Sequence, residues 1–252
     1  MKPDLDKYSN HQPKRHCWAG FTLVELAIVL VVVSLLLVAL LGPLSAQQEQ
    51  KAIMDTKRQL DEAKEALFGF LIANGRLPCP ADPSLSNSAV NSGQERAGGC
   101  ASAANEIGVL PWRTLGLKEQ DAWGHRFTYR VSSQFANAAT PVSLTSPPGV
   151  SVGNIMVLPK AGAPVATAIV GPPEAVAVLV SHGRRADGAW DAAGNKSADS
   201  SDADEAENSN GNATFVDHGN TATQPNDPYD DLLVWVPRNL VFNKLIASGR
   251  LP

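Results

Sequence analysis

An apolar run of bilayer length, with one carboxylate inside it, constrains this 252-residue chain more than any other feature. Residues 21–41 are almost wholly apolar, and Glu25 is the charged residue among them. A helix of this length is roughly 30 Å long, which is enough to cross the hydrocarbon core of a membrane. Lys14 and Arg15 precede the run, so we expect the N-terminus in the cytoplasm and the rest of the chain outside.

Two other interpretations of this segment stay open. A cleaved secretory signal peptide would have an apolar core of about 7–15 residues, and the run here is longer. Cleavage after Ala46 would place Leu44 where such a site needs a small residue. An uncut helix would instead be a plain membrane anchor for a binding domain that never polymerises.

Glu25 needs an explanation because a carboxylate at the bilayer centre costs on the order of 3 kcal/mol. It could reach the headgroups, where it would matter little. Alternatively, cleavage between Gly20 and Phe21 would create an α-amino group about one turn away, and a positive charge there would reduce the cost of burial. That amine pairs poorly with Glu25 of its own helix, but it can meet Glu25 of a neighbouring, staggered helix.

The segment "KRHCWAGFTLVEL" (residues 14–26) resembles the processing site of type IV prepilins and type II secretion pseudopilins. In that family, prepilin peptidase cuts after the glycine and methylates the new N-terminal phenylalanine. The resemblance implies that residues 1–20 are a cleaved leader ending at Gly20, that Phe21 is N-methylated, and that Glu25 is a charge partner between subunits.

The same resemblance implies the partners and the location. The partners would be the prepilin peptidase, other pilin or pseudopilin subunits, the inner-membrane assembly machinery and the membrane itself. The protein would cross the inner membrane once with a periplasmic C-terminal head, and would then enter a periplasmic or extracellular fibre. "DAWGHRFTYR" (residues 121–130) partly resembles a turn-and-strand segment of major pseudopilins, with Ala122 and Phe127 in place of the family's residues.

The pattern after the run predicts an α+β fold. We expect one long helix over residues 21–75, because helix formers continue and a stripe of apolar residues recurs at helical spacing until Gly75. This stripe consists of Ile53, Leu60, Ala63, Leu67 and Leu71. We expect residues 76–252 to form a pilin-like head on an antiparallel sheet. The strands expected lie at residues 126–131, 154–159, 175–183 and 230–237.

Cysteine usage predicts a disulfide. Cys17 lies in the leader, which leaves Cys79 and Cys100 in a chain expected outside the cytoplasm. The bridge would close a polar loop of about 20 residues and contribute roughly 3 kcal/mol. Zinc is a weaker alternative, because no histidine pair accompanies these cysteines.

An acidic stretch within residues 184–228 is rich in polar and small side chains and cannot build a core, so we expect a long surface loop or disorder. Its hard oxygen ligands offer a calcium site, although such loops are usually just solvated. The ligands considered are Asp187, Asp191, Asp199, Asp202 and Asp204, with Asn195 and Glu205 nearby. No other cofactor is expected.

Neither catalysis nor nucleic-acid binding is expected. His125, His182 and His218 lie in or near polar turns, and the sequence holds no nucleotide or hydrolase motif. The net charge is −4, and no basic patch follows the apolar run.

One internal repeat remains. "LFGFLIANGRLP" (residues 67–78) and "VFNKLIASGRLP" (residues 241–252) share several residues at equal offsets. Two helices ended by the same glycine-then-proline pattern would explain part of this match. We expect the second copy to be a short helix that docks where the end of the long helix could also dock.

Overall fold

The computed structural model describes residues 20–97, 100, 105–138, 142, 153–219, 221 and 228–251. Lys14, Arg15 and Cys17 of the expected leader lie outside these residues, as do parts of both expected loops and Pro252. The chain divides into two compact units, Met1–Gln48 and Glu49–Pro252. The first contains the apolar run, and the second contains the sheet.

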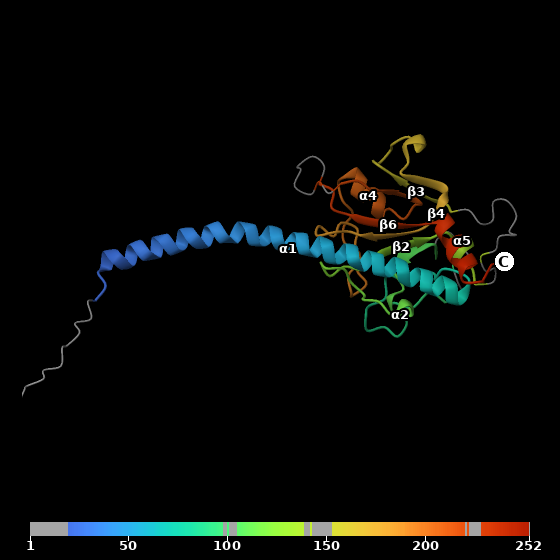
Figure 1. The fold of residues 1–252 in the computed structure, drawn as a ribbon, viewed down its shortest axis with the longest axis horizontal. Coiled ribbons are helices and arrows are strands. Elements are labelled where there is room, and N and C mark those ends of the chain that lie inside the picture. Colours follow the sequence, from blue (N-terminus) through green and yellow to red (C-terminus); the bar gives the residue numbers. More distant parts are fainter. Residues whose placement is uncertain are drawn as a thin grey trace, which may run out of the picture. The chain divides into compact units, whose positions relative to one another are not determined.

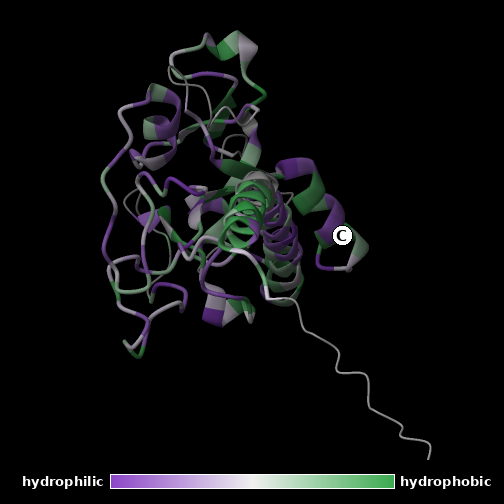
Figure 2. Cartoon of the chain, turned by 90° about the vertical axis from the view of Figure 1, so that its left-hand side faces the viewer, coloured by the Kyte–Doolittle hydropathy of each residue, from purple (hydrophilic) through white to green (hydrophobic). Residues whose placement is uncertain are grey.

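Helix α1 spans Leu23–Asn74 (Figure 1). Seen almost along its axis, it shows both hydrophobic and hydrophilic residues (Figure 2). In the second unit its stripe is buried: Leu60, Ala63, Leu67 and Leu71 are each 3% exposed or less. The helix ends at Asn74. The next residue, Gly75, has a left-handed φ of 71°, and its N–H donates to the Leu71 carbonyl at 2.7 Å.

The second unit is built on one sheet with the order β1-β2-β4-β3-β5, and β6 also pairs with β4. Every pairing is antiparallel except that of β3 with β5, which is parallel. The strands are β1 (Ile107–Val109), β2 (Thr128–Val131), β3 (Ile155–Leu158), β4 (Val170–Ser181), β5 (Thr214–Val216) and β6 (Leu232–Pro237). The shorter elements are α2 (Trp112–Leu115), α3 (Ser133–Ala136), the 3₁₀ helix η2 (Val165–Thr167), α4 (Ala203–Ser209) and α5 (Arg238–Ala247).

The sheet buries side chains on both faces. Tyr129 and Leu179 join the core that contains the α1 stripe. Val178 and Val180 lie on the opposite face, in a second core with Phe215. The fold is therefore α+β with a largely antiparallel sheet, and the four expected strands are confirmed.

Strand β2 differs from the half-buried strand that its alternation predicts. All four of its residues are buried, including Thr128 and Arg130. Arg130 can be buried because its Nη2 donates to Glu106 Oε2 at 2.8 Å. The face that alternation assigns to solvent is thus covered, and its arginine is paired there.

The acidic stretch also differs from the expected surface loop. It contains α4 and β5, and Phe215 is 1% exposed. Asp202 is the N-cap of α4 and accepts from the N–H groups of Asp204 and Glu205. Asn208 exchanges two hydrogen bonds with the backbone of Val216. Capping and side-chain hydrogen bonds therefore order a segment that has few apolar residues.

The C-terminal copy of the repeat forms α5, as expected, and it lies beside the end of α1 (Figure 1). Lys244 Nζ is 5.2 Å from the centre of the Phe68 ring. Arg250 Nη2 donates to the carbonyl of Ala73 in the last turn of α1. Gly249 ends α5 with a φ of 70°, the conformation that Gly75 adopts after α1.

Candidate functional site

The start of α1 is closed by a capping box. Thr22 precedes the first helical residue, and its hydroxyl accepts from the Glu25 N–H at 3.2 Å. In return, Glu25 Oε2 accepts from the Thr22 N–H at 3.3 Å. This reciprocal pair satisfies two N–H groups that the helix leaves unpaired. It also turns the Glu25 carboxylate back toward the residues that precede the helix.

Gly20 and Phe21 lie just before this capping box, and both are exposed. A Cβ built on Gly20 would have no described atom within 4 Å. The described chain thus gives no steric reason for glycine at position 20. Phe21 is 79% exposed, and the large apolar side chains as far as Leu37 are exposed as well.

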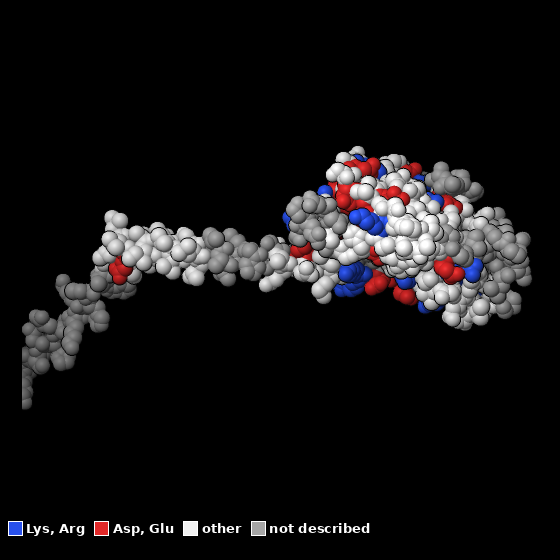
Figure 3. All heavy atoms as spheres, turned by 90° about the horizontal axis from the view of Figure 1, so that it is seen from above, with Lys and Arg blue, Asp and Glu red and all other residues white. Residues whose placement is uncertain are grey.

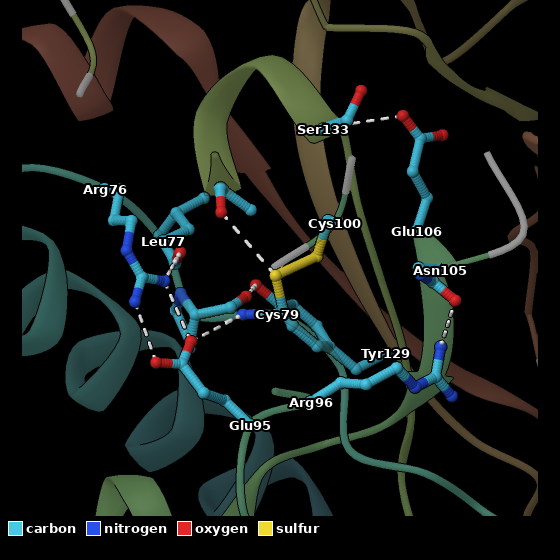
Figure 4. Close-up of a disulfide and its surroundings, with 12 residues drawn as sticks. Arg76, Leu77, Cys79, Glu95, Arg96, Cys100, Asn105, Glu106, Tyr129 and Ser133 are labelled. Carbon is cyan, nitrogen blue, oxygen red and sulfur yellow. Dashed lines mark hydrogen bonds and ion pairs between the residues drawn. A yellow bond between two sulfur atoms is a disulfide. The ribbon is translucent and has the colours of Figure 1, made fainter. Parts of the chain in front are cut away.

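Cys79 and Cys100 form the predicted disulfide (Figure 4). Beside it, Arg76 donates to both oxygens of Glu95 at 2.8 Å, and Glu95 also accepts from the Cys79 N–H. Burial alone would raise the pKa of Glu95, but these hydrogen bonds hold it below its ordinary value. The polar loop is therefore tied down by an ion pair as well as by the disulfide.

A group of buried carboxylates lies at the N-terminal end of β6 and at the start of α4. Oxygens of Glu205, Asp230 and Asp231 all lie within 4.8 Å of one another. Acidic side chains are plentiful on the surface of this unit (Figure 3), but these three are 1%, 4% and 3% exposed. Glu205 comes from the first turn of α4, and the two aspartates immediately precede β6.

Each of these three carboxylates is held through one oxygen. Glu205 Oε1 accepts from the Asp230 N–H at 3.2 Å, and Asp230 Oδ2 accepts from the Arg185 N–H at 3.0 Å. Asp231 Oδ2 accepts from Asn208 Nδ2 at 2.8 Å. The other oxygens of Glu205 and Asp230 are buried and have no hydrogen-bond donor among the described residues.

His182 lies beside Asp231 of this group. Its Nε2 is 2.8 Å from Thr128 Oγ1, and its Nδ1 is 3.6 Å from Asp231 Oδ1. The His182 side chain is 0% exposed, and Nδ1 has no hydrogen-bond partner in the described part of the chain. This cluster of Glu205, Asp230, Asp231 and His182 is called the acidic cluster below.

Burial, reinforced by the charges of Asp231 and Asp230, raises the pKa of Glu205 to about 8. Burial also raises the pKa of Asp230. The nearest side-chain cation recorded is Arg185, whose Nε is 3.5 Å from Glu205 Oε2 and whose side chain is 38% exposed. Among the described residues, the partly exposed Arg185 is thus the arginine that forms an ion pair with these three buried carboxylates.

The carboxylates proposed for calcium from the sequence make separate interactions. Asp187 pairs with Arg185, and Asp191 accepts from the Asn195 N–H. Asp199 pairs with Lys196, while Asp202 caps α4. Asp204 accepts from the Ala161 N–H and lies 3.2 Å from His218 Nε2. The structure brings together a different set of carboxylates, of which the sequence analysis noted only Glu205 in passing.

The three histidines considered for catalysis lie at separate places. His182 belongs to the acidic cluster, and His218 pairs with Asp204. His125 lies in the turn before β2, and its Nδ1 is buried without a hydrogen-bond partner in the described chain. That the chain is not an enzyme stays a prediction.

Two features escaped the sequence analysis. The Thr-x-x-Glu spacing at Thr22 and Glu25 is a capping-box signature, so that feature was available from the sequence. The acidic cluster was not available from the sequence. Except for the neighbours Asp230 and Asp231, its members are 23 or more residues apart and meet only in the folded unit.

Comparisons with protein-family models, with curated proteins and with solved structures find no match to this chain. Among the described residues, no helix is both long enough and apolar enough to cross a membrane.

Proposed function

We propose that this chain is a structural subunit of the pilin or pseudopilin type. Prepilin peptidase would remove residues 1–20, and the processed chain would assemble through its N-terminal helix into a type IV pilus or a type II secretion-like fibre. In this proposal the chain sits in the inner membrane, with residues 76–252 as a periplasmic head, before it joins the fibre.

Gly20 is the observation that carries the proposal. Nothing in the described chain requires glycine there, since a Cβ would meet no atom within 4 Å. A Cβ at Gly69 or at Gly219 would meet no atom either, so this freedom by itself assigns no role to a glycine. The narrow pocket of a peptidase is a requirement that would select glycine at position 20. Its position directly before Phe21, Thr22 and Glu25 matches the processing site that the sequence resembles.

The exposed side chains that follow support the same function. Leu23 is 88% exposed and Leu35 is 67% exposed in the chain by itself. Exposed apolar surface of this extent marks a site of interaction with lipid or with other proteins. Lipid before assembly and the helices of other subunits after it would both cover this surface.

Processing is tested by co-expressing the full chain with a prepilin peptidase. Wild type and Gly20→Ala should be cut, whereas Gly20→Val should stay uncut because the larger side chain does not fit a pocket made for glycine. Immunoblots of the head would follow the mass change. Equal cleavage of Gly20→Val, or cleavage without the peptidase, would contradict the proposal.

Glu25 requires a variant that separates its two roles. Gln at this position keeps the capping box, since its amide oxygen also accepts from the Thr22 N–H, but it removes the charge. Glu25→Gln should therefore be cut normally, with unchanged head stability, and should fail to enter the fibre. Thr22→Ala is the matched control: it loses the cap and keeps the charge, so it should still enter. Normal incorporation of Glu25→Gln would exclude the charge-pair role.

A further inference from the structure

We propose that the three carboxylates of the acidic cluster, Glu205, Asp230 and Asp231, bind one hard divalent cation of the size of calcium. The assembly role proposed above does not involve these residues, so either proposal can fail without the other. The three carboxylates also differ from the set that the sequence suggested for calcium, whose members make separate interactions.

The geometry of the three carboxylates suits a single ion. An oxygen of each lies within 4.8 Å of an oxygen of the other two. Calcium–oxygen bonds are about 2.3–2.6 Å long, so ligands on opposite sides of the ion are about 4.6–5.2 Å apart and adjacent ligands are closer together. One ion placed among the three oxygens could therefore contact all of them with at most small movements of the side chains.

Two atoms of the cluster lack a partner, which points to a ligand. Glu205 Oε2 and Asp230 Oδ1 are buried and have no hydrogen-bond donor among the described residues. The two residues are 1% and 4% exposed, so bulk solvent does not supply the missing donors. Buried polar atoms are nearly always paired, because desolvation without compensation is costly. A cation among the carboxylates would be the missing partner.

The charges of the cluster favour a cation as well. The three carboxylates repel one another, and burial strengthens this repulsion because the protein interior screens charge less than water does. Arg185 Nε is 3.5 Å from Glu205 Oε2, but the Arg185 side chain is 38% exposed and also pairs with Asp187 at 3.0 Å. A dication would place the counter-charge inside the cluster.

The ligand atoms select the class of cation. The atoms that converge are carboxylate oxygens, and hard oxygen ligands suit calcium and magnesium better than zinc or copper. Magnesium usually keeps several waters and binds through one or two carboxylates, whereas calcium accepts a larger and less regular set of protein oxygens. Three carboxylates with little access to solvent therefore favour calcium.

A bound ion would join two parts of the second unit that are distant in the sequence. Glu205 lies in the first turn of α4, and the two aspartates directly precede β6. The ion would therefore fasten the acidic stretch to the sheet, and it should raise the temperature at which this unit unfolds.

The test uses the full chain in detergent, stripped of metal with a chelator and dialysed against Ca²⁺, Mg²⁺ or buffer alone. Bound metal is measured by elemental mass spectrometry, and thermal unfolding is followed in parallel. Wild type should take up one equivalent of Ca²⁺. Its unfolding temperature should rise by about 5–10 °C when Ca²⁺ is at a hundredfold its dissociation constant. The same concentration of Mg²⁺ should give a smaller rise.

Glu205→Gln and Asp230→Asn distinguish a metal ligand from a carboxylate that only supports the fold. Each variant should bind Ca²⁺ at least about tenfold more weakly, because a charged ligand is lost. Without metal, each should unfold at the temperature of metal-free wild type or above it, because one of three repelling charges is gone. Loss of a supporting carboxylate would instead lower the unfolding temperature with and without Ca²⁺.

Asp191→Asn and Asp199→Asn are the matched controls, because they remove carboxylates of the same acidic stretch that lie outside the cluster. Both should bind Ca²⁺ as wild type does, and both should gain the same rise in unfolding temperature.

Wild type that takes up no Ca²⁺, or that takes it up without a rise in unfolding temperature, would overturn the proposal. So would undiminished binding by Glu205→Gln and Asp230→Asn, loss of binding in either control, or a larger rise with Mg²⁺ than with Ca²⁺.

Discussion

Gly183 adopts a φ of 57° directly after His182 and packs against Asp230. A Cβ at this position would lie 2.5 Å from the Asp230 carbonyl oxygen and 2.6 Å from its Cγ. Both the backbone conformation and the close approach therefore require glycine. Gly20 differs in this respect, because a Cβ there would meet no described atom within 4 Å.

Gly183→Ala should lower the free energy of unfolding by about 2–4 kcal/mol, because strain and overpacking add. Gly116→Ala is the control, since Gly116 has a φ of 70° but no atom within 4 Å of the added Cβ; it should cost about 1 kcal/mol. Urea denaturation measures both. Equal losses would show that the contact with Asp230 is not tight.

Glu106 is the residue that allows an arginine inside the sheet. It accepts from Arg130 Nη2, from the Ser133 N–H and from Asn154 Nδ2. Burial alone would raise the pKa of Glu106, but these hydrogen bonds and the charge of Arg130 hold it below its ordinary value. Its ionised form therefore stabilises the fold above its unfolded pKa, and that contribution is lost as pH falls through the folded pKa.

Glu106→Gln should be less stable than wild type by about 3 kcal/mol at pH 7, since Arg130 loses its charged partner. The difference should shrink below the unfolded pKa of about 4.5, with a limiting slope of about 1.4 kcal/mol per pH unit. Urea denaturation between pH 3 and 7 measures it. Glu62 has a side chain that is 58% exposed, so the free energy of unfolding of Glu62→Gln should change with pH as that of wild type does. A difference that stays constant with pH would contradict the ion pair.

At the scale of elements, periodicity was enough to predict the strands that carry long apolar runs. It missed β1 and β5, which are three residues each and too short to show a period. It also assigned Thr128 and Arg130 to solvent, because alternation reports polarity and not burial. The second covered face depends on α4 and on hydrogen bonds from Asn208, and composition indicates neither.

The candidate sites divide in the same way. The sequence could single out Gly20, Phe21 and Glu25 because they form a local motif. It could single out the disulfide because only two cysteines follow the expected leader. The acidic cluster depends on contacts between residues up to 49 positions apart (231 minus 182), which need the sheet in place. Single polar residues in a turn or at a strand end give no sign of such a meeting.

The two copies of the repeat, residues 67–78 and 241–252, contact each other in the second unit. Helix α1 has no basic residue in its last turn, and Arg250 supplies one from the other copy by donating to the Ala73 carbonyl. Positive charge at a helix C-terminus is favourable, because it offsets the exposed carbonyl dipoles. In each copy, the glycine of the shared "GRLP" follows the end of a helix. The arginine of the second copy, Arg250, also caps the C-terminus of α1.

Arg250→Met should lower the free energy of unfolding by about 0.5–1 kcal/mol, the usual size of an exposed helix-end charge. Arg58→Met removes another exposed arginine, from the middle of α1, and should cost less than about 0.5 kcal/mol. Chemical denaturation at low and high salt compares the two, and the Arg250 effect should weaken with salt. An effect no larger than that of Arg58→Met would remove the capping role.

For the whole molecule, the proposed function gives the two units separate tasks. The first, Met1–Gln48, holds the processing motif and an exposed apolar surface with Glu25 as its charged residue. The second, Glu49–Pro252, has its own sheet, its own buried cores and a disulfide. This division is what a subunit needs if its apolar segment passes from lipid to a fibre while its head stays folded.

The central claim is processing at Gly20, and the mass of the mature N-terminus tests it most directly. The full chain would be expressed with and without a prepilin peptidase, and the N-terminal peptide would be identified by mass spectrometry. The account predicts a peptidase-dependent N-terminus at Phe21, heavier by one methyl group. An N-terminus at Gln47, or an intact Met1 in the presence of an active peptidase, would contradict it.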